Sequence, residues 1–389
     1  MPLSDHNDKK WVYRPHTKAK HEVLGKYLMP WTNKLTSYNL QAEQENKVRV
    51  VDCFAGRGSY ADSEGADPLD LEHLQTPAEY PGSPQLILDR LTDRKNQFDT
   101  AECVFIEADK TNYNILKETL ENTTGIAENI SRSYFNGKFQ NAVLDIVEST
   151  QGDDCPTFFF IDPFGFRSLD YNVVTEIGST PQFEFLITFM SRDMNRFLQS
   201  DDHQEALNTV FGTNNWASAI EAYDPKNWIP LVEYYTDRLE ENGPQKTFEY
   251  MISEPETTQT IYYLVFGTNH PNGLKTMREV MNHCGTGEFA YAPKQPEYDR
   301  EQARLPGTGE PTEQFLLDRF GEYIITFKKL VEISSNERKY SDDTESAYRE
   351  AIRELERRGE VDIQRISSKE TGIQGEDLID FHESKEFIG

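Results

Sequence analysis

Short apolar runs alternate with helix-like segments along residues 48 to 190. The runs are rich in β-branched and aromatic residues and predict strands at VRVVDCF (48–54), ECVFIE (102–107), SRSYF (131–135), PTFFFID (156–162) and FEFLITFM (183–190). Between them, helical spacing predicts helices over about 112–121, 138–149 and 169–178, and another that Ser83 caps before Pro84. Apolar strands that alternate with helices are typical of a parallel sheet covered on both faces.

The sheet is expected to end in an antiparallel hairpin. A mostly helical stretch, 202–242, leads to KTFEYMI (246–252) and TIYYLVFG (260–267), which only a short polar segment separates. Because a parallel crossover needs about a dozen residues, these two strands must be antiparallel. Parallel strands followed by such a hairpin predict an α/β fold with a class I methyltransferase-like Rossmann sheet. A nicotinamide-binding Rossmann domain would more often continue with another strand and helix.

The segment before the sheet predicts an amphipathic helix that packs on the core. Its apolar residues recur at helical spacing, and they are Ala19, Val23, Leu24, Tyr27, Leu28 and Trp31. Lys18, Lys20 and His21 lie on or near this helix and form a basic spot in an acidic chain.

The C-terminal part predicts a separate module. Residues 285–311 are rich in Gly, Pro and charge and are typical of a linker. Beyond them we expect a helix around Phe315–Phe320, a second element at ITFKKLVEI, a helix that Thr344 caps and Gly359 ends, and the strand VDIQRI. This outline favours a winged helix-turn-helix domain. The predicted organisation is an N-terminal helical segment (1–47), the sheet domain (48–284), the linker (285–311) and the C-terminal domain with its tail (312–389).

Composition favours a globular, strongly acidic protein. Of 389 residues, 37% are hydrophobic, which is enough to build a core, while 40 Lys and Arg against 67 Asp and Glu leave a formal net charge of −27. The acids are scattered in short groups, which favours adaptation to molar salt, and hence a halophilic archaeal source, over a localised acidic surface that mimics nucleic acid or binds a basic partner. Low basicity does not exclude a nucleic-acid substrate, because high salt already weakens counterion release.

Cysteine usage and hydropathy predict a cytoplasmic location. Cys53, Cys103, Cys155 and Cys284 form no CxxC pair and are interpreted as buried thiols in a reducing compartment. The first residues lack an apolar signal core, and no stretch of about 18 apolar residues occurs. We therefore expect no association with a membrane.

The loop VVDCFAGRGSY (50–60) is the first candidate site. A dinucleotide fingerprint would need a third glycine at position 61, where this chain has Ala61, and would lead directly into a helix. A ligand without phosphate fits better, and S-adenosylmethionine is such a ligand, since an acid at the strand end can reach its ammonium group. A plain connection between two elements is the alternative. The candidate cofactor-binding residues in this loop are Asp52, Phe54, Ala55, Gly56 and Gly58.

The second and third strands add candidates for the same cofactor. Glu107 ends the second strand, where an acid can bind both ribose hydroxyls, and Asp109 is a second candidate. The alternative for Glu107 is a capping acid at the end of a strand. Asn136, after the third strand, lies where adenine-contacting residues often occur, although a simple turn explains it equally well.

The motif FFFIDPFGF (158–166) is the candidate acceptor site. In amino-methyltransferases, motifs of the Asp-Pro-Pro-Tyr type accept hydrogen bonds from the target NH₂ group and stack an aromatic ring on the base. Asp162 and Phe164 could take these catalytic roles, but the second proline is absent, and a turn without chemistry is the alternative. Candidate substrate-binding residues on the same edge are Pro163, Gly165, Arg167 and Arg192. The histidine spacing predicts no metal site.

Six blocks together resemble the three-Cys-motif partner protein family. They are HTKAKHEVLGKYLMPW (16–31), VDCFAGRGSY (51–60), PGSPQLIL (81–88), FIEAD (105–109), FFIDPFGF (159–166) and YYLVFGTNHPNGLKTMREVM (262–281). The C-terminal module resembles the winged helix-turn-helix domain often attached to such proteins. The resemblance implies a methyltransferase that uses S-adenosylmethionine and works with a separate three-cysteine-motif protein, which could bind an iron–sulfur cluster.

The motifs and the resemblance support two functions. The favoured one is a methyltransferase whose acceptor is a nucleic acid or a substrate bound to the partner protein. Methyl transfer depends mainly on positioning, so the lack of an evident general base does not count against it. The alternative is a non-catalytic adaptor or DNA-binding regulator that retains the methyltransferase fold.

Overall fold

The computed structural model describes residues 15–39, 45–61, 79–150, 155–219, 229–253, 260–284, 311–321, 323–337, 344–366, 372–381 and 386–388. The chain divides into two compact units, Met1–Ala292 and Pro293–Gly389. Most of the predicted linker, 285–310, lies outside the described residues, so the boundaries of the linker stay a prediction.

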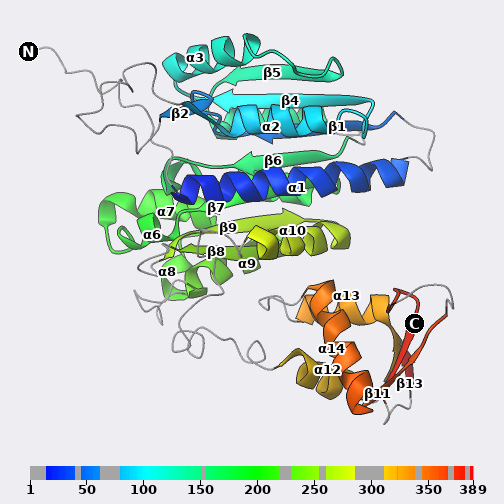
Figure 1. The fold of residues 1–389 in the computed structure, drawn as a ribbon. Helices are drawn as coiled ribbons and strands as arrows, with labels where there is room; N and C mark the ends of the chain where they lie inside the picture. The colour runs from blue at the N-terminus through cyan, green and yellow to red at the C-terminus, as the bar shows by residue number, and fades with distance from the viewer. Residues whose placement is uncertain are drawn as a thin grey trace, which may run out of the picture. The chain divides into compact units, whose positions relative to one another are not determined.

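A seven-stranded sheet forms the centre of the first unit (Figure 1). Its strands are β1 (Lys47–Asp52), β4 (Thr100–Glu107), β5 (Ile130–Asn136), β6 (Thr157–Ile161), β7 (Phe183–Phe189), β8 (Lys246–Ser253) and β9 (Thr260–Thr268). They lie in the order β5-β4-β1-β6-β7-β9-β8, with the first five parallel and β9 antiparallel to both its neighbours. This order and these directions are those of a class I methyltransferase sheet, so the predicted fold class of this unit is confirmed.

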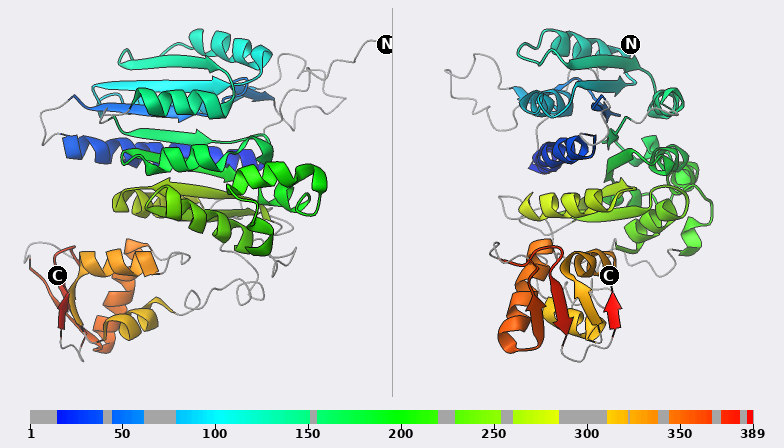
Figure 2. Two further views of the ribbon diagram at one scale, coloured as in Figure 1. Left: turned by 180° about the vertical axis from the view of Figure 1, so that it is seen from behind. Right: turned by 90° about the vertical axis from the view of Figure 1, so that its right-hand side faces the viewer.

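Helices cover both faces of the sheet (Figure 2). One face carries α1 (Pro15–Asn39), α2 (Ser83–Asp93), α3 (Lys110–Glu121) and α10 (Pro271–Cys284), and the other carries α4 (Phe139–Ser149), α5 (Tyr171–Ser179), α7 (Gln204–Phe211) and α9 (Ile229–Asn242). Within β6, Phe158 and Phe160 point to the first layer, whereas Phe159 and Ile161 point to the second. Burial on both faces explains why the central strands are continuous apolar runs. None of the described helices combines the length and apolar character needed to cross a bilayer.

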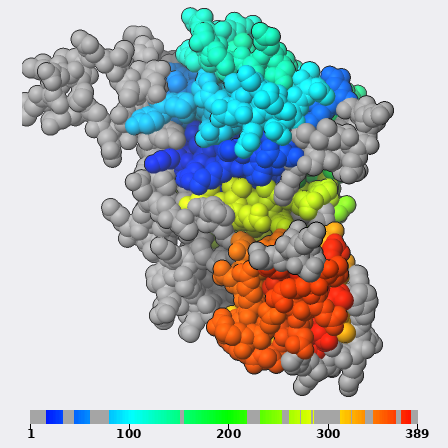
Figure 3. Space-filling view, turned by 45° about the vertical axis from the view of Figure 1, so that its right-hand side comes forward, coloured from blue at the N-terminus to red at the C-terminus, as the bar shows by residue number. Residues whose placement is uncertain are grey.

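Helix α1 lies between α2 and α10. In Figure 3 its blue atoms lie between cyan and yellow ones. The Tyr27 hydroxyl donates to Oε2 of buried Glu184 on β7 over 2.8 Å, and the Thr268 hydroxyl donates to Oε1 of the same carboxylate over 2.5 Å. The predicted packing of this helix on the core is confirmed, and Glu184 joins α1 to both β7 and β9.

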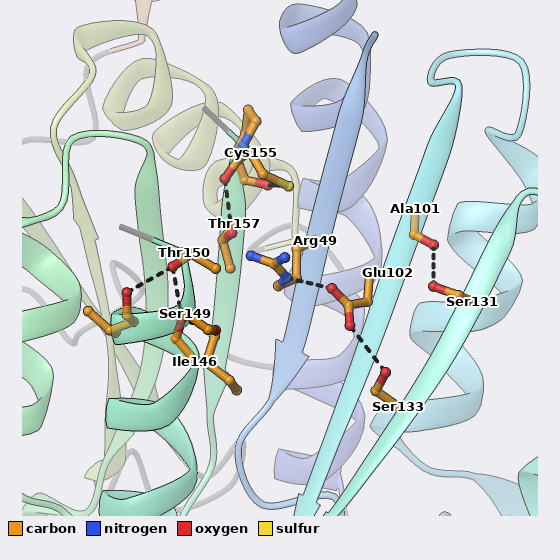
Figure 4. Close-up of polar contacts among 12 residues, drawn as sticks. Arg49, Ala101, Glu102, Ser131, Ser133, Ile146, Ser149, Thr150, Cys155 and Thr157 are labelled. Carbon is orange, nitrogen blue, oxygen red and sulfur yellow. Dashed lines mark hydrogen bonds and ion pairs between the residues drawn. The ribbon is translucent and has the colours of Figure 1, made fainter. Parts of the chain in front are cut away.

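The amino ends of the strands carry a row of polar contacts (Figure 4). Arg49 and Glu102 are register partners on β1 and β4, and Arg49 Nε donates to Glu102 Oε2 over 2.7 Å. Ser133 on β5 donates to the other oxygen of Glu102 over 3.1 Å, and the Thr157 hydroxyl donates to the Cys155 carbonyl over 3.0 Å. At this end, Arg49, Glu102 and Ser133 therefore bind one another across three neighbouring strands.

The chain between β1 and α2 differs from the expectation in two respects. Ser83 is not the cap of α2: the helix begins at Ser83, and Gly82, in an extended conformation, precedes it as the cap. The reason is a close approach, because the Gly82 amide donates to the Gly58 carbonyl over 2.8 Å. The same segment also contains two short antiparallel strands that were not predicted, β2 (Ser59–Ala61) and β3 (Glu79–Pro81), which pair with each other.

The second unit has its own core of helices against a small sheet. Its elements are α12 (Thr312–Phe320), β10 (Tyr323–Thr326), α13 (Phe327–Glu337), α14 (Glu345–Arg358), β11 (Val361–Gln364), β12 (Leu378–Phe381) and β13 (Glu386–Ile388). The sheet order is β11-β12-β10-β13. The predicted ends of α14 are confirmed: the Thr344 hydroxyl accepts from the Ala347 amide, and Gly359 adopts φ 75°. The expected second element is in fact a strand followed by a helix, and the tail contributes buried Ile379 and Phe381.

Candidate functional site

Three acidic residues meet at the carboxyl edge of the sheet. Asp52 ends β1, Glu107 ends β4, and Asp162 directly follows β6. Strand β1 lies between β4 and β6 and runs parallel to both, so the three strand ends are adjacent. In open α/β sheets this edge is where ligands bind. The sequence thus placed these acids on one edge correctly.

Asp52 is completely buried and incompletely satisfied. Its Oδ1 accepts from the Phe54 amide over 3.3 Å, whereas its Oδ2 is buried and has no hydrogen-bond partner among the described residues. Burial raises the pKa of Asp52 to about 7, the nearby Ser83 hydroxyl and the Phe54 amide oppose this shift, and the charges of Asp162 and Glu107 add to it. A buried carboxylate oxygen without a partner is costly. A ligand that supplies an N–H donor or a cation would remove that cost.

A glycine turn holds the backbone close to Asp52. Gly56 and Gly58 have φ angles of 63° and 83°, which L side chains rarely adopt. A Cβ atom on Gly82 would lie only 2.8 Å from the carbonyl carbon and oxygen of Gly58. The two other residues predicted in this loop make structural contacts: Phe54 packs against Phe139, and the Ala55 amide donates to a strand carbonyl.

Glu107 orders the same turn from the neighbouring strand. Its Oε2 accepts from the Gly56 amide over 3.0 Å, and its Oε1 accepts from the Asp109 amide over 2.7 Å. Burial raises the pKa of Glu107, and these backbone hydrogen bonds oppose the shift. A carboxylate offers about four acceptor positions, so roughly two remain for a ligand.

The two other predicted cofactor residues are exposed and make local contacts. Asp109 caps α3, and its side chain accepts from the Asn112 amide over 2.8 Å. The Asn136 amide group donates to the Glu107 carbonyl over 2.9 Å. Both residues lie beside Glu107, and their assignment as cofactor ligands stays a prediction.

Asp162 forms a buried ion pair that the sequence analysis did not foresee. The Lys20 ammonium of α1 contacts Asp162 Oδ2, and the two residues are only 8% and 9% exposed. Asp162 Oδ1 is buried and has no hydrogen-bond partner among the described residues. The basic spot was visible in the sequence, but only the packing of α1 across the sheet brings it to the site.

His21, the neighbour of Lys20, lies in the same environment. It is buried, and its ring meets the Tyr60 ring edge to face at 5.7 Å between centroids. Burial lowers the pKa of His21 to about 3, the Lys20 charge adds to that shift, and Asp162 opposes it. His21 is therefore neutral at physiological pH, and Lys20 carries the cationic charge that faces Asp162.

The remaining predicted residues surround the turn after β6. Phe164 is 59% exposed, whereas Pro163 is buried and Gly165 half-buried. Arg167 contacts His203, which stacks on Phe197 at 4.1 Å, and Arg192 lies in the short helix α6 (Ser191–Asn195) after β7. Phe164 is thus a largely exposed aromatic residue two positions after Asp162.

The described residues include no group of three or more His, Cys, Asp or Glu side chains arranged to hold a metal ion. The four cysteines are free and buried.

Comparisons with known proteins found matches among solved structures alone. No family model matches the chain, and no curated protein matches it.

Among solved structures, a Legionella pneumophila protein assigned to DUF519 is 16% identical, covers 70% of this chain and 92% of its own, and has a TM-score of 0.38. Human Methyltransferase-like protein 13 in complex with SAH is 12% identical, with coverages of 73% and 98% and a TM-score of 0.32. Trm1 from Pyrococcus horikoshii with S-adenosyl-L-methionine is 9% identical, with coverages of 97% and 93% and a TM-score of 0.36. The fold assignment of this chain follows from its strand order and directions.

Proposed function

We propose that this protein is a methyltransferase that uses S-adenosylmethionine. The observation that carries the proposal is the buried Asp52 oxygen that lacks a partner among the described residues. It lies at the end of the first strand of a class I methyltransferase sheet, beside a left-handed glycine turn and next to Glu107. The ammonium group of the cofactor would satisfy this oxygen, so the residues present fit the cofactor.

Each acid would have its own role. Asp52 would bind the ammonium group, Glu107 would accept from the ribose hydroxyls through its remaining lone pairs, and the backbone of Gly56 and Gly58 would pass close to the ligand. The cofactor supplies an activated methyl group on a sulfonium sulfur and leaves as a neutral thioether. Asp162 would hold an acceptor N–H at Oδ1, which is buried and unpartnered among the described groups, while exposed Phe164 would stack on an aromatic acceptor.

Calorimetric titration with S-adenosylmethionine and S-adenosylhomocysteine in molar KCl tests the proposal. We expect Glu107→Ala to weaken binding by at least about tenfold, because it removes both the ribose contact and the anchor of the glycine turn. Glu102→Gln is the matched control, since Glu102 lies on the same strand at the opposite end of the sheet. A folded wild-type protein that binds neither ligand would contradict the proposal.

The acceptor is proposed to be a nucleic acid or a substrate delivered by a separate three-cysteine-motif protein, which could carry an iron–sulfur cluster. The second unit supports a winged-helix module, because helix, strand, helix, helix and three strands follow in this order. Within α14, Arg349 donates to Glu345 over 2.6 Å and Arg358 to Glu354 over 3.0 Å. Arginines paired in this way favour a protein partner over phosphate groups as the ligand of the module.

A non-catalytic adaptor is the second candidate. The Lys20–Asp162 ion pair favours it, because Lys20 occupies one oxygen of the proposed acceptor site. Cofactor binding without methyl transfer to nucleic acid or protein, even with a three-cysteine-motif protein present, would support the adaptor. Transfer of labelled methyl groups to either class of substrate would contradict it.

A further inference from the structure

The charge at the acceptor side of the site depends on two residues that are 142 positions apart in the sequence. Asp162 follows β6, Lys20 projects from α1, and each is about nine-tenths buried. Opposite charges buried in contact compensate each other, and removing one leaves the field of the other poorly screened.

This pair lies beside the proposed cofactor acid, because Asp162 follows β6, and Asp52 ends β1, the parallel neighbour of β6. The charge of Asp162 contributes to the raised pKa of Asp52, and both Lys20 and Asp162 shift the pKa of His21, whose ring meets Tyr60 beside the glycine turn. A charge change at the pair would therefore be felt by a ligand bound at Asp52.

We infer that Lys20 is a specificity-determining residue, which neutralises Asp162 and so sets how strongly the site prefers a cationic sulfonium ligand over its neutral thioether product. The inference rests on the proposed function. Asp162 Oδ1 is buried and has no described donor, so among the described cations only Lys20 pairs with the negative charge of Asp162. Helix α1 is in this view part of the reaction centre as well as part of the layer that covers the sheet.

The affinities for S-adenosylmethionine and S-adenosylhomocysteine, measured by calorimetry at one fixed salt concentration, test this role. In Lys20→Met, the uncompensated carboxylate should raise the preference for the sulfonium ligand by about tenfold. In Asp162→Asn, the uncompensated ammonium should lower it by about tenfold. The double variant Lys20→Met/Asp162→Asn should return to within about threefold of the wild type, because both charges are gone.

Lys26→Met is the matched control, since Lys26 lies on the same helix and pairs with Glu22 at the surface. It should leave the ratio of the affinities for S-adenosylmethionine and S-adenosylhomocysteine unchanged. If Lys20→Met does not fold, the affinity ratios of Asp162→Asn and of the double variant are compared with that of the wild type. Unchanged ratios in Asp162→Asn and Lys20→Met, or shifts in the same direction, would overturn the inference and leave the proposed function intact. A folded wild-type protein that binds neither ligand would instead contradict the proposed function itself.

Discussion

The two ends of the central sheet use polar side chains differently. At the amino ends, both oxygens of Glu102 accept hydrogen bonds, from Arg49 and Ser133, and the Thr157 hydroxyl donates to a carbonyl. At the carboxyl ends, Asp52 and Asp162 each keep one buried oxygen that has no partner among the described residues. Polar groups that satisfy one another stabilise a fold, whereas buried acceptors left open are costly and indicate a place for a ligand. This difference between the carboxylates favours the carboxyl ends of the strands as the site.

The largest effect is expected from the ion pair at the carboxyl end. Lys20→Met should lower the free energy of unfolding by about 3–5 kcal/mol, because it leaves Asp162 buried without its cation. Lys26→Met, which removes an exposed pair on the same helix, should cost less than about 1 kcal/mol. Urea denaturation at fixed salt measures both values. Equal losses of stability in the two variants would show that burial of the Lys20–Asp162 pair does not make it more important than the exposed Lys26–Glu22 pair.

The pH dependence of stability should report on Asp52. Its pKa is raised to about 7, so between about pH 4 and pH 7 the folded protein holds a proton that the unfolded chain has released. The stabilisation is complete below about pH 4 and is lost as the pH rises through about 7, with a slope of up to about 1.4 kcal/mol per pH unit. Asp52→Asn should remove this slope, which denaturation at several pH values would reveal. Parallel profiles for the variant and the wild type would contradict the assignment to Asp52, because the contribution of Glu107 is common to both.

The close approach of two glycines should be the next most sensitive feature. Gly82→Ala places a Cβ atom 2.8 Å from the Gly58 backbone, and we expect a loss of about 2 kcal/mol together with weaker cofactor binding. Gly137→Ala, at the same end of the sheet, meets no atom within 4 Å and serves as the control. Thermal unfolding and calorimetry measure the two effects. If both alanine variants behaved alike, the Gly58–Gly82 approach would not be what fixes the turn.

The smallest effect is expected at the amino end. Arg49→Met removes one charge-assisted hydrogen bond to Glu102 and should cost about 1–2 kcal/mol of stability. It should leave the affinity for S-adenosylmethionine unchanged, since the pair lies at the opposite edge from Asp52. A loss of affinity without a loss of stability would mean that the two ends of the sheet are coupled.

The sheet was predictable from the sequence because its signals are local. Each central strand is a continuous apolar run, and the short link between β8 and β9 allows only an antiparallel pair. For the same reason Asp52, Glu107 and Asp162 could be assigned to one edge, since each stands at the end of a run. Side chains that act at the end of a parallel strand are visible before any tertiary structure is known.

The residues that the sequence missed depend on long-range packing. Lys20 and His21 were visible as a basic spot, but no local pattern indicates which strand end a covering helix will meet. The cap of α2 was assigned to Ser83 on helix statistics, whereas contact with Gly58 determines that Gly82 precedes the helix. In the tail, Leu378, Ile379 and Phe381 form only a short apolar group among polar residues, so the inner strand β12 was not predicted.

The separation of α1 from its partners has a consequence for biosynthesis. Lys20 and Tyr27 precede Asp162 and Glu184 by 142 and 157 residues, so α1 leaves the ribosome well before either acid has been made. Docking of α1 on an incomplete sheet would bury the Lys20 ammonium without a counter-ion, which is strongly unfavourable. Domains of this size fold with their N-terminal segments synthesised first, and non-local contacts form late. Helix α1 is thus translated early but is among the last elements to be fixed in place, because its buried charge disfavours docking before β6 has been translated.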